Sequence, residues 1–261
     1  MTAKVTSINK ESITQLKEYV LYLADNSMIL GQRLGEWCGH GPILEQDIAM
    51  TNIALDLIGE ARSLYQYIAE LDGNGATEDD YPYKRDVLLW RNLLLVEQPN
   101  EDFAYTIVRQ FLFDVIHYHQ LQQLLHSKDE RLSAIAHKSI KEARYHLKYS
   151  SEWMVRLGDG TEISHKKMQT ALDARYPYFA EAFVATESEQ AMIDAQVAPD
   201  CQELLPAASS MVQEVVERAT LTLPEVPWPQ RGGKTGTHSE HLGFILSDLQ
   251  FLQKTYPNSQ W

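Results

Sequence analysis

The fold is decided by residues 101–157, EDFAYTIVRQFLFDVIHYHQLQQLLHSKDERLSAIAHKSIKEARYHLKYSSEWMVRL. Apolar side chains recur there at steps of three and four residues, which is the period of a helix with one buried face. The polar stretch SKDE at 127–130 interrupts the pattern, so two long helices are expected, at about 101–126 and 131–157. Because a short link makes consecutive helices antiparallel neighbours, the stretch predicts a helical hairpin.

A second hairpin is expected upstream of the first. Helical periodicity covers about 9–37 and 44–71, and the turn sequence GHGP at 39–42 separates the two segments. A longer connection, at about 72–100, then leads to the first hairpin. Four long helices in two hairpins, joined by one long crossover, are typical of a ferritin-like antiparallel four-helix bundle.

The remaining segments are shorter, and none shows the alternating pattern of a strand. The expected elements are an acidic exposed loop at 76–83, a short apolar helix at 85–97, helices at about 164–186, 201–221 and 238–256, an acidic connector at 187–200 and a Pro/Gly segment at 222–237. The chain is therefore expected to be all-α. It would form a single ferritin-like domain over 1–261, with the core bundle at about 9–157 and additional C-terminal helices at about 158–261.

Composition narrows the classes of function. The 261 residues are 44% hydrophobic and 23% charged, as in globular proteins, and the net charge of −13 argues against a nucleic-acid or anionic-membrane surface. No secretory signal and no apolar run of membrane-spanning length is evident. Cys38 and Cys201 are far apart, which excludes a zinc ribbon and favours free thiols in a reducing cytoplasm.

Polar residues are expected inside the bundle. Residues equidistant from a hairpin turn lie at the same height, which pairs Asn26 with Asp56 and Asp114 with Glu142. All four lie deep in their helices, and the seams around Asn26, Asp114 and Glu142 are largely apolar. Since a buried polar group needs a partner, these residues either ligate a metal or form a hydrogen-bonded network.

The ligand pattern of a di-iron bundle is incomplete here. That pattern needs a carboxylate from each of two helices and Glu-x-x-His from each of the other two. The first helix offers the amide of Asn26; glycine (Gly59) stands three residues after Asp56, and tyrosine (Tyr145) three residues after Glu142. Both imidazoles are missing, so the sequence favours a degenerate site with a metal-free polar core.

Two histidines keep an alternative open. His117 follows Asp114 by three residues and His146 follows Glu142 by four, so either could help to hold a metal. Glu60 is expected to face solvent or a partner. The alternative is a divergent di-iron or di-manganese oxidase that acts on its own through Asp56, Asp114, His117, Glu142 and His146.

Four separate blocks carry a family resemblance. They are LGQRLGEWCGHGPILEQDIAMTNIALDLIGEAR at 30–62, NLLLVEQPNEDFAYTIVRQ at 92–110, KSIKEARYHLKYS at 138–150 and GGKTGTHSEHLG at 232–243. Together they resemble the C-subunit family of bacterial phenylacetyl-CoA epoxidases, the ring 1,2-epoxidase complexes of phenylacetate degradation. The resemblance covers essentially the whole chain.

The resemblance implies a non-catalytic structural subunit with a ferritin-like fold whose own site has lost its metal. A homologous A subunit would hold the di-iron centre, where one oxygen atom of O2 enters the aromatic ring of phenylacetyl-CoA. Electrons would come from NADPH through a reductase subunit with FAD and an iron–sulfur centre, and the CoA thioester would bind mainly on the partner. None of the catalytic residues of the A subunit can be transferred to positions of this chain.

The glycine-rich segment RGGKTG at 231–236 is not a phosphate-binding P-loop, because Trp228 stands where that motif needs glycine and no strand precedes it. It could be a flexible connector or a partner-contacting loop, and Arg231 and Lys234 could touch a partner or the phosphates of CoA.

A third function remains open for the whole chain. It could be a free-standing helical scaffold that forms a monomer or homodimer and binds a small molecule in its core.

Overall fold

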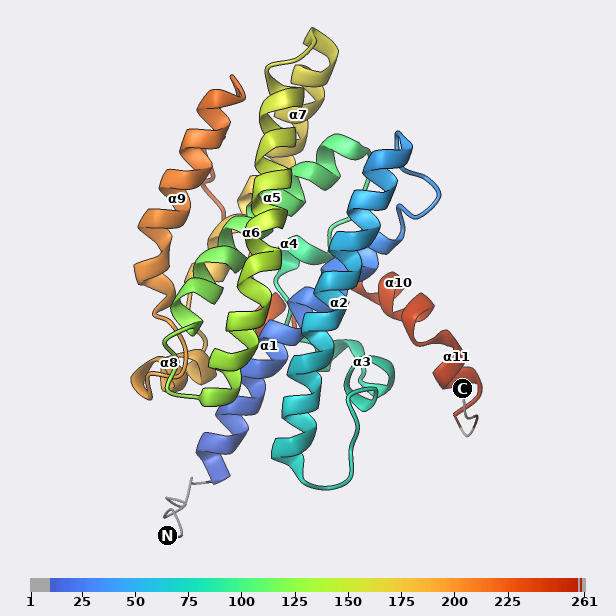
Figure 1. Cartoon of the computed structure of the whole chain (residues 1–261), viewed down its shortest axis with the longest axis vertical. Coiled ribbons are helices and arrows are strands. Elements are labelled where there is room, and N and C mark those ends of the chain that lie inside the picture. The colour runs from blue at the N-terminus through green and yellow to red at the C-terminus, as the bar shows by residue number, and fades with distance from the viewer. Residues whose placement is uncertain (1–9, 258, 260–261) are drawn as a thin grey trace.

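The computed structural model describes residues 10–257 and 259. Within that part of the chain every regular element is a helix, so the prediction of an all-α protein is confirmed (Figure 1). None of the described helices is long and apolar enough to cross a membrane. Cys38 and Cys201 are both free thiols, as predicted.

The first hairpin consists of α1 (Lys10–Gly35) and α2 (Leu44–Asp72). The carboxylate of Asp47 secures the turn, because it accepts hydrogen bonds from the N–H groups of Gly39 and Gly41 at 2.8 and 3.0 Å. Helix α2 ends at Gly73, whose φ of 60° is the left-handed conformation that favours glycine. Both helices lie within two residues of their predicted bounds.

The second hairpin consists of α5 (Phe103–Leu124) and α6 (Glu130–Gly158). Both helices begin at aspartate caps, since Asp102 accepts from the N–H groups of Ala104 and Tyr105 and Asp129 accepts from that of Leu132. The hairpins pack together along α2 and α6, which run antiparallel side by side (Figure 1). This arrangement encloses the core between the four long helices.

The crossover between the hairpins departs from the prediction. Part of the expected loop forms α3 (Asp80–Lys84), and the helix expected at 85–97 is wrong, since only η1 (Val87–Leu89) and α4 (Leu94–Glu97) are helical there. Trp90 and residues 92–97 are buried because a largely irregular chain threads through the interior there, whereas Val87, Leu88 and Leu89 are exposed. Trp90 is fully buried beneath the guanidinium of Arg85, 4.6 Å from its ring centre.

The C-terminal part surrounds the two hairpins with shorter helices. They are α7 (Glu162–Arg175), η2 (Tyr176–Phe183), α8 (Glu187–Asp194), α9 (Cys201–Arg218), η3 (Gly233–Thr235), α10 (Glu240–Leu249) and α11 (Phe251–Thr255). The helix expected at 164–186 changes to 3-10 geometry where Pro177 lacks a backbone N–H. The connector expected at 187–200 contains α8, which starts with a capping box between Thr186 and Glu189.

Candidate functional site

The predicted polar positions divide between the interior and the surface. Asn26 and Asp114 are buried, whereas Asp56 and Glu142 are half-buried at the seam between α2 and α6. The structure corrects the position of Tyr145, whose side chain is 53% exposed on the outer face of α6. The next residue, His146, takes the inward position instead.

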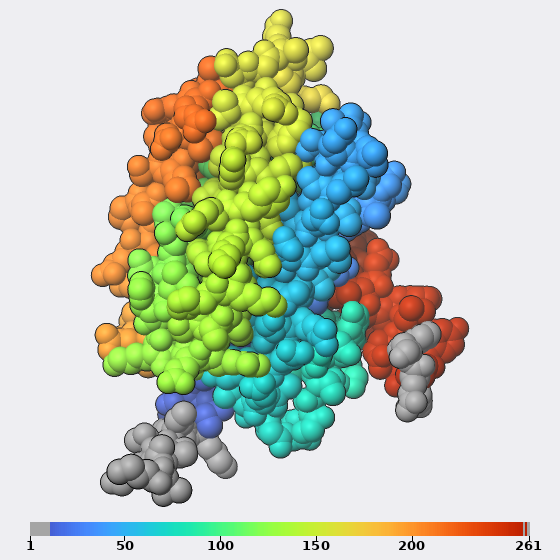
Figure 2. Space-filling model, viewed as in Figure 1, coloured from blue at the N-terminus to red at the C-terminus, as the bar shows by residue number. Residues whose placement is uncertain are grey.

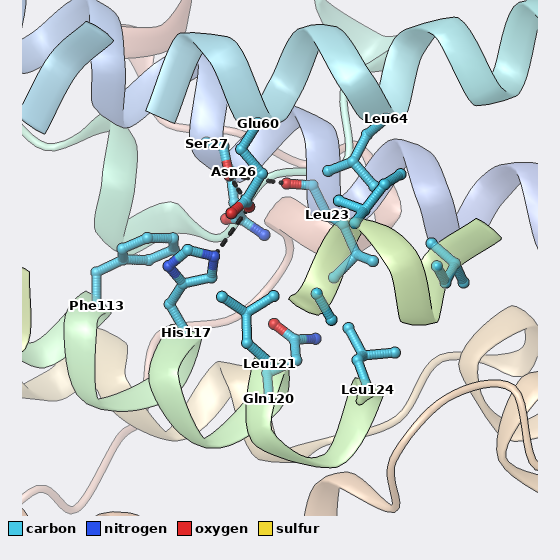
Figure 3. Close-up of a pocket in the computed structure, with 13 residues that line it drawn as sticks. Leu23, Asn26, Ser27, Glu60, Leu64, Phe113, His117, Gln120, Leu121 and Leu124 are labelled. Carbon is cyan, nitrogen blue, oxygen red and sulfur yellow. Dashed lines mark hydrogen bonds and ion pairs between the residues drawn. The ribbon is translucent and has the colours of Figure 1, made fainter. Parts of the chain in front are cut away.

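The centre of the interior is an acid–base pair that the sequence analysis did not predict. Oε1 of Glu60 lies 2.9 Å from Nε2 of His117 and accepts a hydrogen bond of 2.9 Å from the hydroxyl of Ser27 (Figure 3). The expectation that Glu60 faces solvent or a partner is therefore wrong. A helical-period signal was present, because Leu57 and Leu64 precede and follow Glu60 by three and four residues and are buried on the same face.

The two charges of this pair support each other. Burial alone would lower the pKa of His117, but the neighbouring carboxylate of Glu60 raises it above its ordinary value. Burial alone would raise the pKa of Glu60, but the imidazolium of His117 and the hydrogen bonds to the carboxylate lower this pKa. Glu60 and His117 therefore form a buried ion pair that joins α2 to α5.

Asp114 is satisfied by a different set of donors. Its two oxygens accept hydrogen bonds of 2.7 Å, one from the side-chain amide of Gln110 and one from the hydroxyl of Ser150. Burial raises the pKa of Asp114 to about 6, although these donors and the nearby His146 partly oppose the rise. Neutral hydrogen bonds rather than a paired cation thus hold this carboxyl group.

The second imidazole, His146, bonds to a third carboxylate. Its Nε2 lies 3.0 Å from Oδ2 of Asp56, across the seam between α6 and α2. Glu142 lies beside this pair, and its pKa is raised by burial and by the negative charges of Asp56 and Glu60. The acidic residues of the site are therefore distributed over separate hydrogen-bonded groups.

Asn26 performs a task that a carboxylate could not. Its amide nitrogen donates a hydrogen bond of 2.8 Å to the carbonyl of Tyr22, and its amide oxygen accepts one of 2.9 Å from the N–H of Leu93. One side chain with both a donor and an acceptor thereby ties α1 to the buried crossover. Gly59 stands nearby on α2 with open space around it, so its position holds no ligand group.

These contacts decide whether the site fits a di-metal centre. A ferritin-like centre needs carboxylates and imidazoles that converge on shared ions. Here each imidazole is bonded to its own carboxylate, and nowhere in residues 10–257 or at 259 do three His, Cys, Asp or Glu side chains meet in a group able to hold a metal ion. The donor set as placed does not fit such a centre.

The cavity beside this acid–base pair is also too small for an organic ligand. A cavity beside Glu60 and His117 is lined mainly by apolar side chains and has a volume of about 20 Å³ open to the centre of a water molecule (Figure 3). That is room for about one water molecule. An aromatic ring or a CoA thioester would not fit in this cavity without a large rearrangement.

Comparison with known proteins gives the family. The family described as "Phenylacetic acid catabolic protein" has a model that matches residues 1–261. The chain belongs to this family. It is also 46% identical over 249 residues to the C subunit of the 1,2-phenylacetyl-CoA epoxidase of Escherichia coli (strain K12), an alignment that covers 95% of this chain and 100% of the relative. The resemblance inferred from the four sequence blocks is thereby confirmed.

In this member of the phenylacetic acid catabolic family, the glycine-rich segment is docked rather than free. Lys234 is buried, with its ammonium 2.7 Å from the carboxylate of Glu189 and 2.9 Å from the carbonyl of Val184. A side chain on Gly233 would meet the carbonyl oxygen of Asn92 at 2.2 Å, so the backbones touch there. Only Arg231, which is exposed, presents a free surface position for the predicted contact with a partner or with CoA.

Two further buried carboxylates hold the same segment, and sequence reasoning missed both. Glu181 accepts from the backbone N–H groups of Leu94 and Gly232, each at 2.8 Å. Glu97 lies 3.0 Å from Nδ1 of His238 and accepts from the N–H of Ser239 at 2.6 Å. Neither carboxylate shows a spacing that predicts these partners, because every contact joins segments remote in sequence.

Proposed function

We propose that this chain is the C subunit of a 1,2-phenylacetyl-CoA epoxidase and that its role in the complex is structural. The observation that carries the proposal is the 46% identity to the C subunit from Escherichia coli, over 95% of this chain and the whole of the relative. Full-length coverage at this identity supports the proposal that the chain occupies the C-subunit position of an epoxidase complex in aerobic phenylacetate catabolism.

The interior supports a non-catalytic role. We interpret the two hairpins as a ferritin-like bundle in one domain, in which hydrogen-bonded pairs replace a metal centre. Asp114 bonds to Gln110 and Ser150, and Glu60 bonds to His117 and Ser27. Because these buried carboxylates have hydrogen-bond partners within the chain, the bundle needs no cofactor to hold them, and its surface can serve as a fixed support for a partner.

The chemistry then belongs to other subunits. We propose that a homologous A subunit holds the di-iron centre and most of the CoA thioester, and that a reductase subunit supplies electrons from NADPH through FAD and an iron–sulfur centre. The complex would operate in the cytoplasm. The small cavity beside His117 supports this division, since it is too small to hold the substrate.

Reconstitution tests the proposal. The chain is purified alone and together with the A subunit and the reductase, and metal content and NADPH-dependent epoxidation of phenylacetyl-CoA are measured. We expect substoichiometric metal and no turnover for the chain alone, and turnover once the other subunits are present. Stoichiometric metal that is lost on Asp114→Ala, together with turnover by the chain alone, would instead establish an independent di-metal oxidase.

A further inference from the structure

A row of large apolar side chains lies exposed along α2. Leu44, Ile48 and Leu55 are 71%, 51% and 61% exposed, and their spacing of four and seven residues places them on one face of the helix. Gly59 continues the row, and a side chain there would meet nothing within 4 Å. Polar Thr51 and Asn52 separate Ile48 from Leu55 along this face, but three large apolar side chains exposed on one helix face still indicate a contact surface.

A row of basic side chains lies exposed along α6. Lys138, Lys141 and Lys148 occupy one helix face together with Tyr145, at steps of three, four and three residues. Within the described part of the chain, Lys138 and Lys141 form no ion pair, although the charge of Lys138 acts on the nearby Glu142, and Lys148 makes only an exposed contact of 3.8 Å to Glu152. On a chain with a net charge of −13, such a concentration of positive charge is distinctive.

The two rows are neighbours on one surface. The hydrogen bond between Asp56 and His146 joins α2 to α6, and these residues directly follow Leu55 and Tyr145 in sequence. Figure 2 shows α2 and α6 side by side across the face in view, with no other described element over them. We call this surface the α2–α6 face; it consists of Leu44, Ile48, Leu55, Lys138, Lys141, Tyr145 and Lys148.

We propose that the α2–α6 face is the docking surface for the catalytic A subunit, which presents there an apolar patch edged by carboxylates. This inference rests on the proposed function. The apolar row and Tyr145 supply the side chains that an interface core buries, while Gly59 lets a partner backbone approach closely. The lysine row supplies the orientation, since the carboxylates proposed at the edge of the partner's patch would be repelled by most of this acidic chain and attracted to this row.

Matched variants of the full chain test the inference against the A subunit of the same epoxidase. Leu55→Asp removes an apolar contact, and Lys138→Glu with Lys141→Glu reverses the charge of the basic row. The controls are Ile163→Asp and Lys166→Glu, equally exposed positions on α7. The dissociation constant is measured by sedimentation at low and high salt, and circular dichroism verifies that each variant is folded.

Each face variant should weaken binding at least about tenfold, and each control should stay within about twofold of the wild type. The effect of the charge reversal should shrink at high salt, whereas that of Leu55→Asp should persist. Wild-type binding with unaffected face variants would overturn this inference and leave the proposed function standing. If the wild-type chain did not bind the A subunit, both this inference and the proposed function would be overturned. If the face variants abolished a homodimer of this chain but still bound the A subunit, the face would instead be the contact with a second copy of this chain.

Discussion

Glu60 and His117 meet at 2.9 Å between α2 and α5, in the interior between the two helical hairpins. An ion pair thus links one helix of each hairpin. A buried pair of this kind adds little stability relative to apolar residues, but loss of one partner leaves an uncompensated charge. The pair therefore constrains which single substitutions the interior tolerates.

The pair predicts strong coupling between two substitutions. His117→Leu should lower the free energy of unfolding by about 3–5 kcal/mol, because Glu60 remains buried without its cation. Adding Glu60→Gln should restore a large part of that loss, since the charge disappears while the hydrogen bond from Ser27 can remain. Urea denaturation of the two single variants and the double variant measures the coupling. Simple additivity of the two single effects would contradict the pairing.

Asp114 predicts a pH dependence of stability. Its pKa of about 6 lies above the ordinary 3.8, so the folded protein binds the proton more tightly than the unfolded chain does. The resulting contribution to stability is full below about pH 4 and is lost as the pH rises through about 6. Complete ionisation would then cost on the order of 3 kcal/mol.

Asp114→Asn should remove this dependence. An amide keeps the bond from Ser150 and can donate to the oxygen of Gln110, which has no hydrogen-bond partner in the wild type. The variant should be the more stable protein at pH 8 and should approach the wild type at pH 5. Urea denaturation across that range provides the measurement, and parallel pH curves for the two proteins would refute the assignment.

The sequence predicted the long helices well because their signals are local. Apolar periodicity and turn residues located α1, α2, α5 and α6 within a few residues, and the pairing of helices brought Asn26, Asp56, Asp114 and Glu142 toward one region. These positions depend on helix period and hairpin geometry, which a single chain segment already contains.

The predictions that were wrong concern contacts between segments that are remote in sequence. In the crossover at 85–97, Trp90 and residues 92–97 are buried in a mostly irregular chain, whereas Val87, Leu88 and Leu89 are exposed. An apolar run alone does not distinguish such a segment from a helix. Lys234 appeared to be a free basic group until Glu189, 45 residues earlier in the sequence, was seen beside it. Glu60 is the exception, since its apolar neighbours Leu57 and Leu64 did mark its face as buried.

The two hydrogen bonds of Asn26 predict that a carboxylate cannot replace its side-chain amide without a loss of stability. Asn26→Asp keeps an acceptor for the N–H of Leu93 but loses the donor to Tyr22 and buries a charge. The free energy of unfolding should fall by about 2 kcal/mol or more. Asn52→Asp, on the exposed side of the same hairpin, is the control and should change stability by less than about 0.5 kcal/mol. Equal thermal stability of the two variants would show that Asn26 does not anchor the crossover.

Substitution by methionine should have different effects on stability at Lys234 and at Arg231, although both residues lie in one loop. Lys234→Met removes the cation 2.7 Å from the buried Glu189 and should destabilise the protein by about 3–5 kcal/mol, loosening the contact of the loop with α8. Arg231→Met changes an exposed side chain and should stay within about 0.5 kcal/mol of the wild type. Chemical denaturation and hydrogen exchange of residues 230–240 measure the two effects. If Lys234→Met left both unchanged while it weakened binding of CoA or of a partner, Lys234 would be a ligand contact and its place in the fold would be incidental.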